Sequence, residues 1–165
     1  MTEFIEAVPS DAPRLGAFLR KAWKEAGPGA LGWTGAKDAN MEEIASEAFL
    51  SGLLAEPTTK VFAAQDAGEF LGVAVLRRLE ATVGELAGII VLESRTGEGV
   101  GRSLLAAVLE HARADGTKEI VVRTEAANNR ALRFYQGFGF DIVDRGPEDV
   151  QGAKVNLVTL RCRLD

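Results

Sequence analysis

Two hydrophobic periods alternate along the chain and predict a protein built from both helices and strands. Apolar residues that recur every three or four positions indicate amphipathic helices, whereas alternating or short continuous apolar runs indicate strands. Helices are expected over residues 9–26, about 41–54, about 100–115 and about 128–139. Strands are expected over residues 4–8, 61–65, 70–78, 84–92, 119–123, 140–144 and 155–163.

The order of these elements sets the expected fold class. Two helices follow the first strand, and strands and helices then interleave, which is typical of an α+β protein. We predict a central mixed, mostly antiparallel sheet flanked by helices. The length of 165 residues favours a single domain over residues 1–165. A long segment rich in glycine and small residues, 28–40, separates the first two helices, and loops of this length are often functional.

Composition and charge narrow the classes of partner. No apolar run is long enough to span a membrane, and the first residues lack the basic-then-apolar layout of a signal peptide. We therefore expect a cytoplasmic protein with no membrane partner. The net charge is −5, from 19 basic and 24 acidic residues. This balance argues against a nucleic-acid partner, because the neutralisation of phosphates requires clustered Lys and Arg.

Metal and hydrolase chemistry are disfavoured by the two residues that would have to supply them. The chain has one histidine, His111, and one cysteine, Cys162, whereas zinc sites typically combine several such ligands. We therefore expect no metal. A Ser-His-Asp or Cys-His centre would have to use His111, which we interpret as a solvated residue on the polar side of a helix. Cys162 is interpreted as structural.

A glycine-rich turn, S-R-T-G-E-G-V-G-R-S-L-L at residues 94–105, joins an expected strand to an expected helix. Such a turn can hold phosphate through free backbone N–H groups and the positive end of the helix dipole. The P-loop pattern requires a lysine after its last glycine, where this chain has Arg102. The dinucleotide pattern requires G-x-G-x-x-G and an acidic residue ending the next strand, which here ends V-V-R.

Two segments together carry a resemblance to a known family. The turn follows the spacing of [Q/R]-x-x-G-x-[G/A], with Gly99 and Gly101 at its glycine positions and Thr96 at its first position. The segment N-N-R-A-L-R-F-Y-Q-G-F-G-F, at residues 128–140, matches N-x-x-A-x-x-[FL]-Y-x-x-x-G-F. In this order and at this separation, the two segments resemble the coenzyme A-binding turn and the later helix of the GNAT N-acetyltransferase superfamily. The resemblance implies a GNAT-like acyl-CoA N-acyltransferase fold with acetyl-CoA as co-substrate.

The resemblance also implies a binding path for acetyl-CoA. The pantetheine arm is expected to pair with the backbone of one strand, which must then splay from the strand at residues 119–123. The residues expected in this pairing are Ile89, Ile90 and Val91. Asn128 is the expected side-chain partner of the arm. The backbone amides expected around the pyrophosphate are those of Thr96, Gly97, Glu98, Gly99, Val100, Gly101, Arg102 and Ser103.

Acetyl transfer to an amine needs a proton acceptor for the amine and a donor for the departing thiolate. Tyr135, the single tyrosine of the chain, matches the family tyrosine near the coenzyme sulfur and is expected to be the donor; a core aromatic would fit the same helix position. Glu85 and Glu125 are both candidates for the base and for acceptor contact, and either also fits a solvated strand-end carboxylate. Trp33 is expected either to wall the acceptor pocket or to fill the core. A backbone N–H near Val91 is expected to polarise the thioester carbonyl.

We therefore expect an acetyl-CoA-dependent N-acetyltransferase that moves an acetyl group to a primary amine by direct attack in a ternary complex. The acceptor is an amine-bearing small molecule or a protein or peptide, and the sequence does not specify which. A non-catalytic acyl-CoA-binding or sensing module is the alternative, because Thr96 replaces the family's Gln or Arg and Glu98 stands where Lys or Gly is common. A nucleotide-dependent oxidoreductase is a third functional hypothesis. Many members of the family are dimers, and the sequence leaves a homodimer open.

Overall fold

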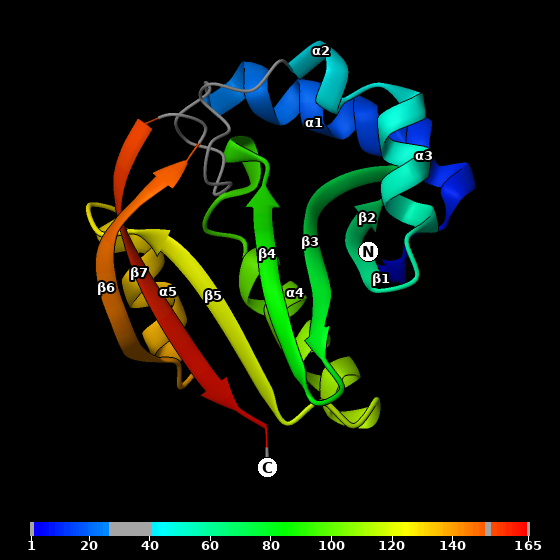
Figure 1. The fold of residues 1–165 in the computed structure, drawn as a ribbon. Helices are drawn as coiled ribbons and strands as arrows, with labels where there is room; N and C mark the ends of the chain where they lie inside the picture. The colour runs from blue at the N-terminus through cyan, green and yellow to red at the C-terminus, as the bar shows by residue number, and fades with distance from the viewer. Residues whose placement is uncertain (1, 27–40, 151–152, 165) are drawn as a thin grey trace.

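The computed structural model describes residues 2–26, 41–150 and 153–164, and within them seven strands form one sheet (Figure 1). Among these strands the order is β1-β2-β3-β4-β5-β7-β6, and each neighbouring pair is antiparallel except β4 with β5. The predicted mixed, mostly antiparallel sheet is confirmed. The strands are β1 (Glu3–Glu6), β2 (Thr59–Asp66), β3 (Glu69–Glu80), β4 (Val83–Val91), β5 (Glu119–Glu125), β6 (Asp141–Val150) and β7 (Ala153–Arg163).

Helices cover both faces of the sheet. Helices α4 and α5 pack on one face, and α1 and α3 pack on the other. Strand β2 shows this division residue by residue, because Phe62 belongs to the core under α4 while Val61 and Ala63 belong to the core under α1. The helices are α1 (Ala12–Ala26), α2 (Met41–Ile44), α3 (Glu47–Ala55), α4 (Val100–Ala114) and α5 (Asn129–Gly137), with short 3-10 turns η1 (Pro9–Asp11) and η4 (Glu93–Arg95).

The single helix predicted over residues 41–54 is wrong, because Ser46 divides this segment into α2 and α3. The backbone of Ser46 is extended, and its hydroxyl accepts a hydrogen bond from the Phe49 N–H at 3.2 Å. The same hydroxyl donates to the Glu43 carbonyl at 2.7 Å. Serine competes for backbone groups in this way at helix starts. The new start lets α3 bury Leu50 completely in the core under α1.

Two smaller expectations also change. Strand β6 continues to Val150, whereas the pattern predicted its end near residue 144. The interpretation of His111 as a solvated side chain is wrong. Its ring is half-buried and meets the Phe62 ring edge-on, with centroids 4.9 Å apart, and its Nε2 lies 3.3 Å from Nζ of Lys60. The ring therefore packs α4 onto the sheet.

In the described residues no helix is both long and apolar enough to cross a membrane.

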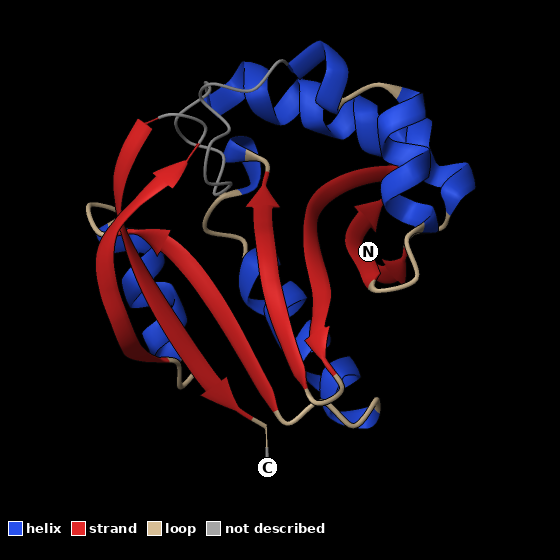
Figure 2. Ribbon diagram, viewed as in Figure 1, coloured by secondary structure: helices blue, strands red, loops and turns tan. Residues whose placement is uncertain are grey.

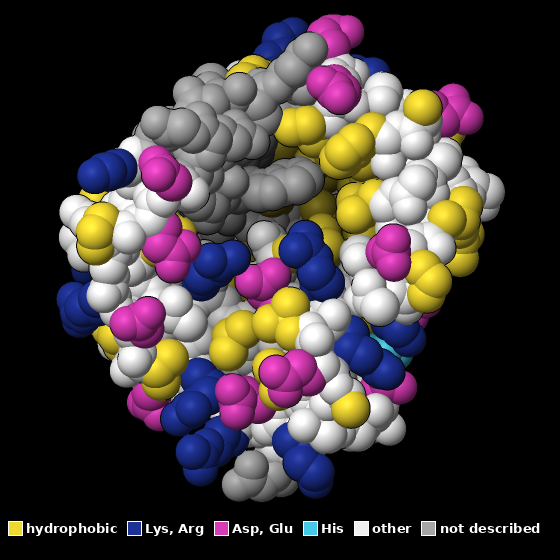
Figure 3. Space-filling view, viewed as in Figure 1, with side chains coloured by type: hydrophobic (Ala, Val, Ile, Leu, Met, Phe, Trp, Pro, Cys, Tyr) yellow, Lys and Arg dark blue, Asp and Glu magenta, His cyan; other side chains and the backbone are white. Residues whose placement is uncertain are grey.

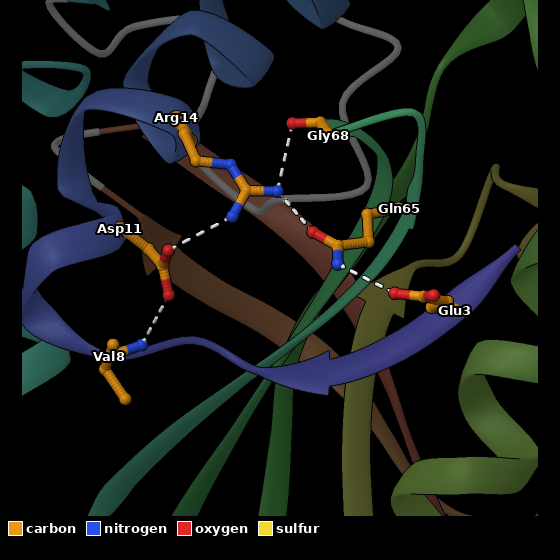
Figure 4. A network of polar contacts seen from close by, with 6 residues as sticks. All are labelled: Glu3, Val8, Asp11, Arg14, Gln65 and Gly68. Atoms are coloured by element: carbon orange, nitrogen blue, oxygen red, sulfur yellow. Dashed lines mark hydrogen bonds and ion pairs between the residues drawn. The ribbon is translucent and has the colours of Figure 1, made fainter.

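A polar network fixes the start of α1 over the sheet (Figure 4). The Arg14 guanidinium donates to the Gln65 side chain and to the Gly68 carbonyl, the latter at 3.0 Å, and also reaches Asp11 at 3.2 Å. Gln65 donates in turn to Glu3 at 3.2 Å. The guanidinium also lies 4.4 Å from the centre of the Phe70 ring. Arg14 thus joins α1 to β2, to β3 and to the turn between them, and Gln65 extends the network to β1.

Strands β4 and β5 part halfway along their length. Their parallel pairing ends at Leu86 with Val122, although β4 continues to Val91. Strand β5 pairs with β7 on its other side along its whole length, and beyond Leu86 and Val122 it diverges from β4 (Figure 2). The splay that the resemblance required is therefore present. A bulge at Ala87, which the register with β3 skips, lies at the point of divergence.

Candidate functional site

The glycine-rich turn links the end of β4 to the start of α4, and its glycines have different roles. Gly97 and Gly99 have φ angles of +90° and +81°, which residues with a Cβ rarely adopt. Gly101 lacks a positive φ, and a Cβ added there would lie 3.4 Å from Cγ2 of Val91 and 3.8 Å from the Phe134 ring. The first two glycines therefore shape the turn, whereas a Cβ at the third would make only ordinary van der Waals contacts.

Some backbone amides of the turn already donate a hydrogen bond to the backbone, and the others, called the open amides, do not. The used N–H groups bond within the turn at 3.0–3.3 Å, and they belong to Thr96, Glu98 and Ser103. The open N–H groups have no described backbone acceptor, and they belong to Gly97, Gly99, Val100, Gly101 and Arg102. Amides in the first turn of a helix lack acceptors within the helix and attract anions. The amide set expected around a pyrophosphate thus narrows to the open five, and their role stays a prediction.

The charge of Glu98 within the turn is paired with a neighbouring arginine. Its carboxylate forms an ion pair with Arg95 at 3.2 Å, and half of the side chain is exposed. Arg95 thereby neutralises the negative charge that the sequence places within an anion-binding turn. The effect of Glu98 on a bound phosphate is further reduced by solvent screening.

The open edge of β4 offers backbone groups to a ligand. The Leu92 N–H donates to the Leu71 carbonyl of β3 at 2.9 Å. Because successive N–H groups of a strand point to opposite sides, those of Val91 and Ile89 point away from β3, toward the gap before β5. Ile89, Ile90 and Val91 lie beyond the last pair between β4 and β5. Their position therefore fits a strand-like ligand along β4.

Helix α5 carries two of the predicted site residues. Asn128 caps the helix, and its side-chain oxygen accepts from the Ala131 N–H at 3.1 Å. Tyr135 is 5% exposed in the core under α4, and burial raises the pKa of its phenol to about 12. Among the described residues its hydroxyl has no hydrogen-bond partner, yet none of their fully buried side-chain polar atoms is unsatisfied. The hydroxyl therefore reaches accessible space and is free to donate.

A pocket of about 190 Å³ lies on the opposite face of the sheet, beneath α1 and α3. Its apolar wall comes partly from those helices, through Leu15, Leu19, Leu50 and Leu53. Ala87 and Gly88, at the bulge of β4, also line it. Hydrophobic side chains follow one wall of the hollow, and basic and acidic side chains lie together at its lower end (Figure 3).

Glu85 lies at this polar end between two arginines. Its side chain is 12% exposed, its Oε1 lies 3.6 Å from Nη1 of Arg77, and its Oε2 lies 3.5 Å from Nη2 of Arg123. Both arginines also line the pocket. Glu125, the other candidate base, is half-buried at the end of β5, two residues beyond Arg123 and thus on the same face. Trp33 lies outside the described residues.

The arrangement joins an anion-binding turn, an open strand edge and a pocket with a polar end. A family model described as the Acetyltransferase (GNAT) family matches residues 19–140, which is more than half of the chain. The chain belongs to the GNAT family. The match confirms the family that the two sequence motifs indicated.

Curated GNAT relatives support the match over part of the chain. An L-methionine sulfoximine/L-methionine sulfone acetyltransferase from Pseudomonas paraeruginosa is 31% identical over 109 residues, and the same values hold for its counterpart in Pseudomonas aeruginosa. These matches cover 62% of this chain and 63% of each relative. The matched segment therefore spans less than two thirds of the relatives' length.

Solved GNAT structures share the fold over nearly all of the chain. An N-acetyltransferase from Staphylococcus aureus Mu50 matches with a TM-score of 0.78 and 19% identity, over 100% of this chain and 99% of that one. The PaiA N-acetyltransferase from Thermoplasma acidophilum, in complex with coenzyme A, matches with a TM-score of 0.75 and 18% identity, over 99% of both chains. These likenesses confirm the GNAT fold.

Two residues that line the pocket of this GNAT protein, Arg77 and Arg123, were not predicted from the sequence. Arg77 is the next-to-last residue of the strand expected at 70–78, and Arg123 ends the strand expected at 119–123, where the V-V-R ending served only to exclude a dinucleotide site. A signal was present, because in a strand Arg77 shares a face with Val75 and Val73, which are apolar. A charged residue that continues an apolar face marks the end of a core or the rim of a pocket.

Proposed function

We propose that the protein is an acetyl-CoA-dependent N-acetyltransferase that acetylates a small primary amine by direct attack in a ternary complex. One observation carries the proposal: the open amides at the start of α4 continue an edge of β4 that no described strand pairs with. Membership of the GNAT family and the acetyltransferase names of the curated relatives support the same reaction. The Thermoplasma neighbour was solved with coenzyme A.

The proposed binding of acetyl-CoA uses backbone more than side chains. The five open amides from Gly97 to Arg102 hold the pyrophosphate at the N-terminus of α4. Ile89, Ile90 and Val91 pair with the pantetheine arm along the open edge of β4. The Asn128 amide nitrogen remains available to the arm while its oxygen caps α5. The Val91 N–H then points toward the thioester carbonyl and polarises it.

Proton transfer follows from the chemistry of an amine and a thioester. An amine of lysine-like pKa is neutral in only about one molecule in a thousand at pH 7, so a proton must leave it before attack. The amine nitrogen then forms a bond to the carbonyl carbon, and the carbon–sulfur bond breaks. The departing thiolate takes a proton or a hydrogen bond from the Tyr135 hydroxyl, which burial keeps neutral.

Glu85 is the proposed acceptor of the amine proton, directly or through water. Among the described residues that line the pocket it is the only acidic one, and it lies two residues before the bulge at Ala87. Glu125 is the second candidate, from the same face of β5. The two assignments differ in position, because Glu85 lies where β4 and β5 still pair and Glu125 lies at the far end of β5.

A thiol-release assay with acetyl-CoA and a panel of primary amines tests the proposal. We expect amine-dependent release of coenzyme A and a product heavier than the amine by one acetyl group. A sensing module would bind acetyl-CoA, as measured by calorimetry, and release no thiol with any amine. An oxidoreductase would instead be protected from unfolding by NAD and not by coenzyme A.

A further inference from the structure

We propose that the amine acceptor is an α-amino acid with an aliphatic side chain, whose carboxylate binds Arg77 and Arg123. This inference rests on the proposed function and names the substrate class of the same site. In it, Glu85 receives the ammonium group, and the leucine and valine side chains of the pocket receive the substrate side chain. Arg77 and Arg123 are thereby specificity-determining residues.

The three charged residues come from three neighbouring strands and share one face of the sheet. Arg77 lies on β3, Glu85 on β4 and Arg123 on β5. Glu85 forms an ion pair with Arg77 at 3.6 Å and with Arg123 at 3.5 Å. Both nitrogen–oxygen distances are too long for strong hydrogen bonds. Each guanidinium has five N–H donors in a planar fork that suits a carboxylate. Both arginines therefore hold donors that Glu85 does not use.

Exposure and charge favour an anionic group at this end of the pocket. The Arg77 and Arg123 side chains are 50% and 47% exposed, whereas Glu85 is 12% exposed. The charged pocket-lining residues thus carry one positive charge in excess, in a protein whose net charge is −5. The second partner of Arg123, Glu148 at 3.0 Å, does not line the pocket. A ligand carboxylate gains from both guanidinium groups, while a polyamine meets repulsion.

An α-amino acid matches the order of charges across the three strands, which is positive at Arg77, negative at Glu85 and positive at Arg123. Its ammonium and carboxylate groups are attached to the same carbon, and Glu85 lies beside each arginine. The ammonium can therefore face Glu85 while the carboxylate faces a guanidinium. Ala87 and Gly88 line the same pocket, and a Cβ added to Gly88 would meet open space. The amine nitrogen is thus held beside the open part of β4.

The rest of the pocket suits a short aliphatic side chain. Its wall is formed by leucine and valine residues of α1, α3, β2 and β3, among them Leu19, Leu50, Val61 and Val73. Its volume of about 190 Å³ is smaller than that of pockets for drug-sized ligands, which are typically about 300–1,000 Å³. A single small amino acid fits this space better than a peptide chain.

The test compares three amines that share one side chain: L-leucine, L-leucinamide and 3-methylbutylamine. Thiol release is measured with the wild-type protein, Arg77→Gln, Arg123→Gln and the control Arg78→Gln. Arg78 follows Arg77 on β3, is equally exposed, and pairs with Asp115 at 2.7 Å outside the pocket. Melting temperatures of all four proteins show whether any change is structural.

We expect the wild-type kcat/KM for L-leucine to exceed that for L-leucinamide by about tenfold or more. The amide has the less basic amine, so its larger neutral fraction cannot produce this preference. Each pocket variant should lose roughly tenfold to a hundredfold in kcat/KM for L-leucine, mainly through KM, and little for the other two amines. Arg78→Gln should match the wild type.

Equal or better use of L-leucinamide by the wild type would overturn the inference and leave the proposed function intact. Equal losses for all three amines in the pocket variants would also overturn it. Calorimetry with L-leucine and the protein–coenzyme A complex needs no turnover, and an absence of binding would reject the amino-acid acceptor. If coenzyme A binds and no amine at all is acetylated, the proposed function itself is rejected.

Discussion

Glu85 Oε2 lies 3.5 Å from Nη2 of Arg123, and this ion pair joins β4 to β5 one residue before the two strands part. The same carboxylate also faces Arg77 on β3. Arg77, Glu85 and Arg123 therefore form a row of charges across β3, β4 and β5. The row lies where the pocket meets the open edge of β4. A charged group at such a point can both hold a substrate and transfer its proton.

Glu85→Gln should lower kcat/KM near neutral pH by roughly 100-fold, the usual loss when a general base is removed. The loss should be greatest at low pH, where the amine is most protonated, and should shrink as the pH approaches the amine pKa. Glu148→Gln is the matched control, because it also removes an ion pair from Arg123 but lies outside the pocket. A pH–rate profile of unchanged shape would exclude Glu85 as the base and direct attention to Glu125.

Tyr135→Phe should lower turnover by about tenfold or more, because the proposed proton donor for the thiolate is lost. The affinity for coenzyme A should change little, since the proposed binding contacts to it are made by β4, the turn and Asn128. The stability should also change little, because no described residue forms a hydrogen bond with the hydroxyl. Single-turnover kinetics and calorimetric titration with coenzyme A check both expectations. An unaltered turnover number would remove Tyr135 from the mechanism.

The phenol of Tyr135 should titrate far above the pH at which an exposed tyrosine ionises. Burial raises its pKa to about 12, and it is the single tyrosine of the chain, so ultraviolet difference spectra report on it alone. Below about pH 9 both the folded and unfolded states hold the neutral phenol. As the pH rises toward 12 the unfolded state ionises first, and roughly 3 kcal/mol of unfolding free energy should be lost.

Urea unfolding at about pH 9 and pH 11.5 measures this loss, with Tyr135→Phe as the reference for every other group that titrates in the range. The difference in stability between the two proteins should shift in favour of the variant at the higher pH. A native-state transition near pH 10 would contradict the burial of the hydroxyl.

The parts of the site that are local in sequence could be predicted from it, and those that depend on three-dimensional convergence could not. The turn and α5 were predictable because glycine spacing and the Asn128 cap act within a few residues. The row of Arg77, Glu85 and Arg123 was not, because strand register and the splay decide which charges meet. The interruption between α2 and α3 was not predicted for another reason. The apolar helical pattern continues through Ser46, but the hydrogen bonds of its hydroxyl end one helix and start the next.

Glu98→Lys should tighten coenzyme A binding slightly and leave turnover unchanged. The substitution removes the ion pair with Arg95 and places a positive charge beside the open amides, but the side chain is half exposed and its field is screened. Glu110→Lys makes the same charge change on an exposed position of α4, about 15 Å farther along the helix. Calorimetry in low and high salt should show a salt-dependent gain for Glu98→Lys that exceeds that of the control. A large loss of affinity would mean that the turn binds phosphate differently.

Gly16→Ala should destabilise the protein, whereas Gly52→Ala should stabilise it. A Cβ at Gly16 would lie 2.5 Å from the Ala45 carbonyl oxygen, so α1 must move away from the segment before α3. Overpacking of this kind costs about 1–3 kcal/mol, which exceeds the gain of about 1 kcal/mol from replacing a helical glycine. A Cβ at Gly52 meets nothing within 4 Å, so only that gain remains.

Urea unfolding should separate the two variants by about 2 kcal/mol in unfolding free energy at equal m-value. Because α1 and α3 supply one wall of the pocket, Gly16→Ala should also raise the KM for the acceptor and leave the affinity for coenzyme A unchanged. Equal stability of the two variants would show that α1 does not approach Ala45 this closely. An effect on coenzyme binding alone would place the acceptor pocket elsewhere.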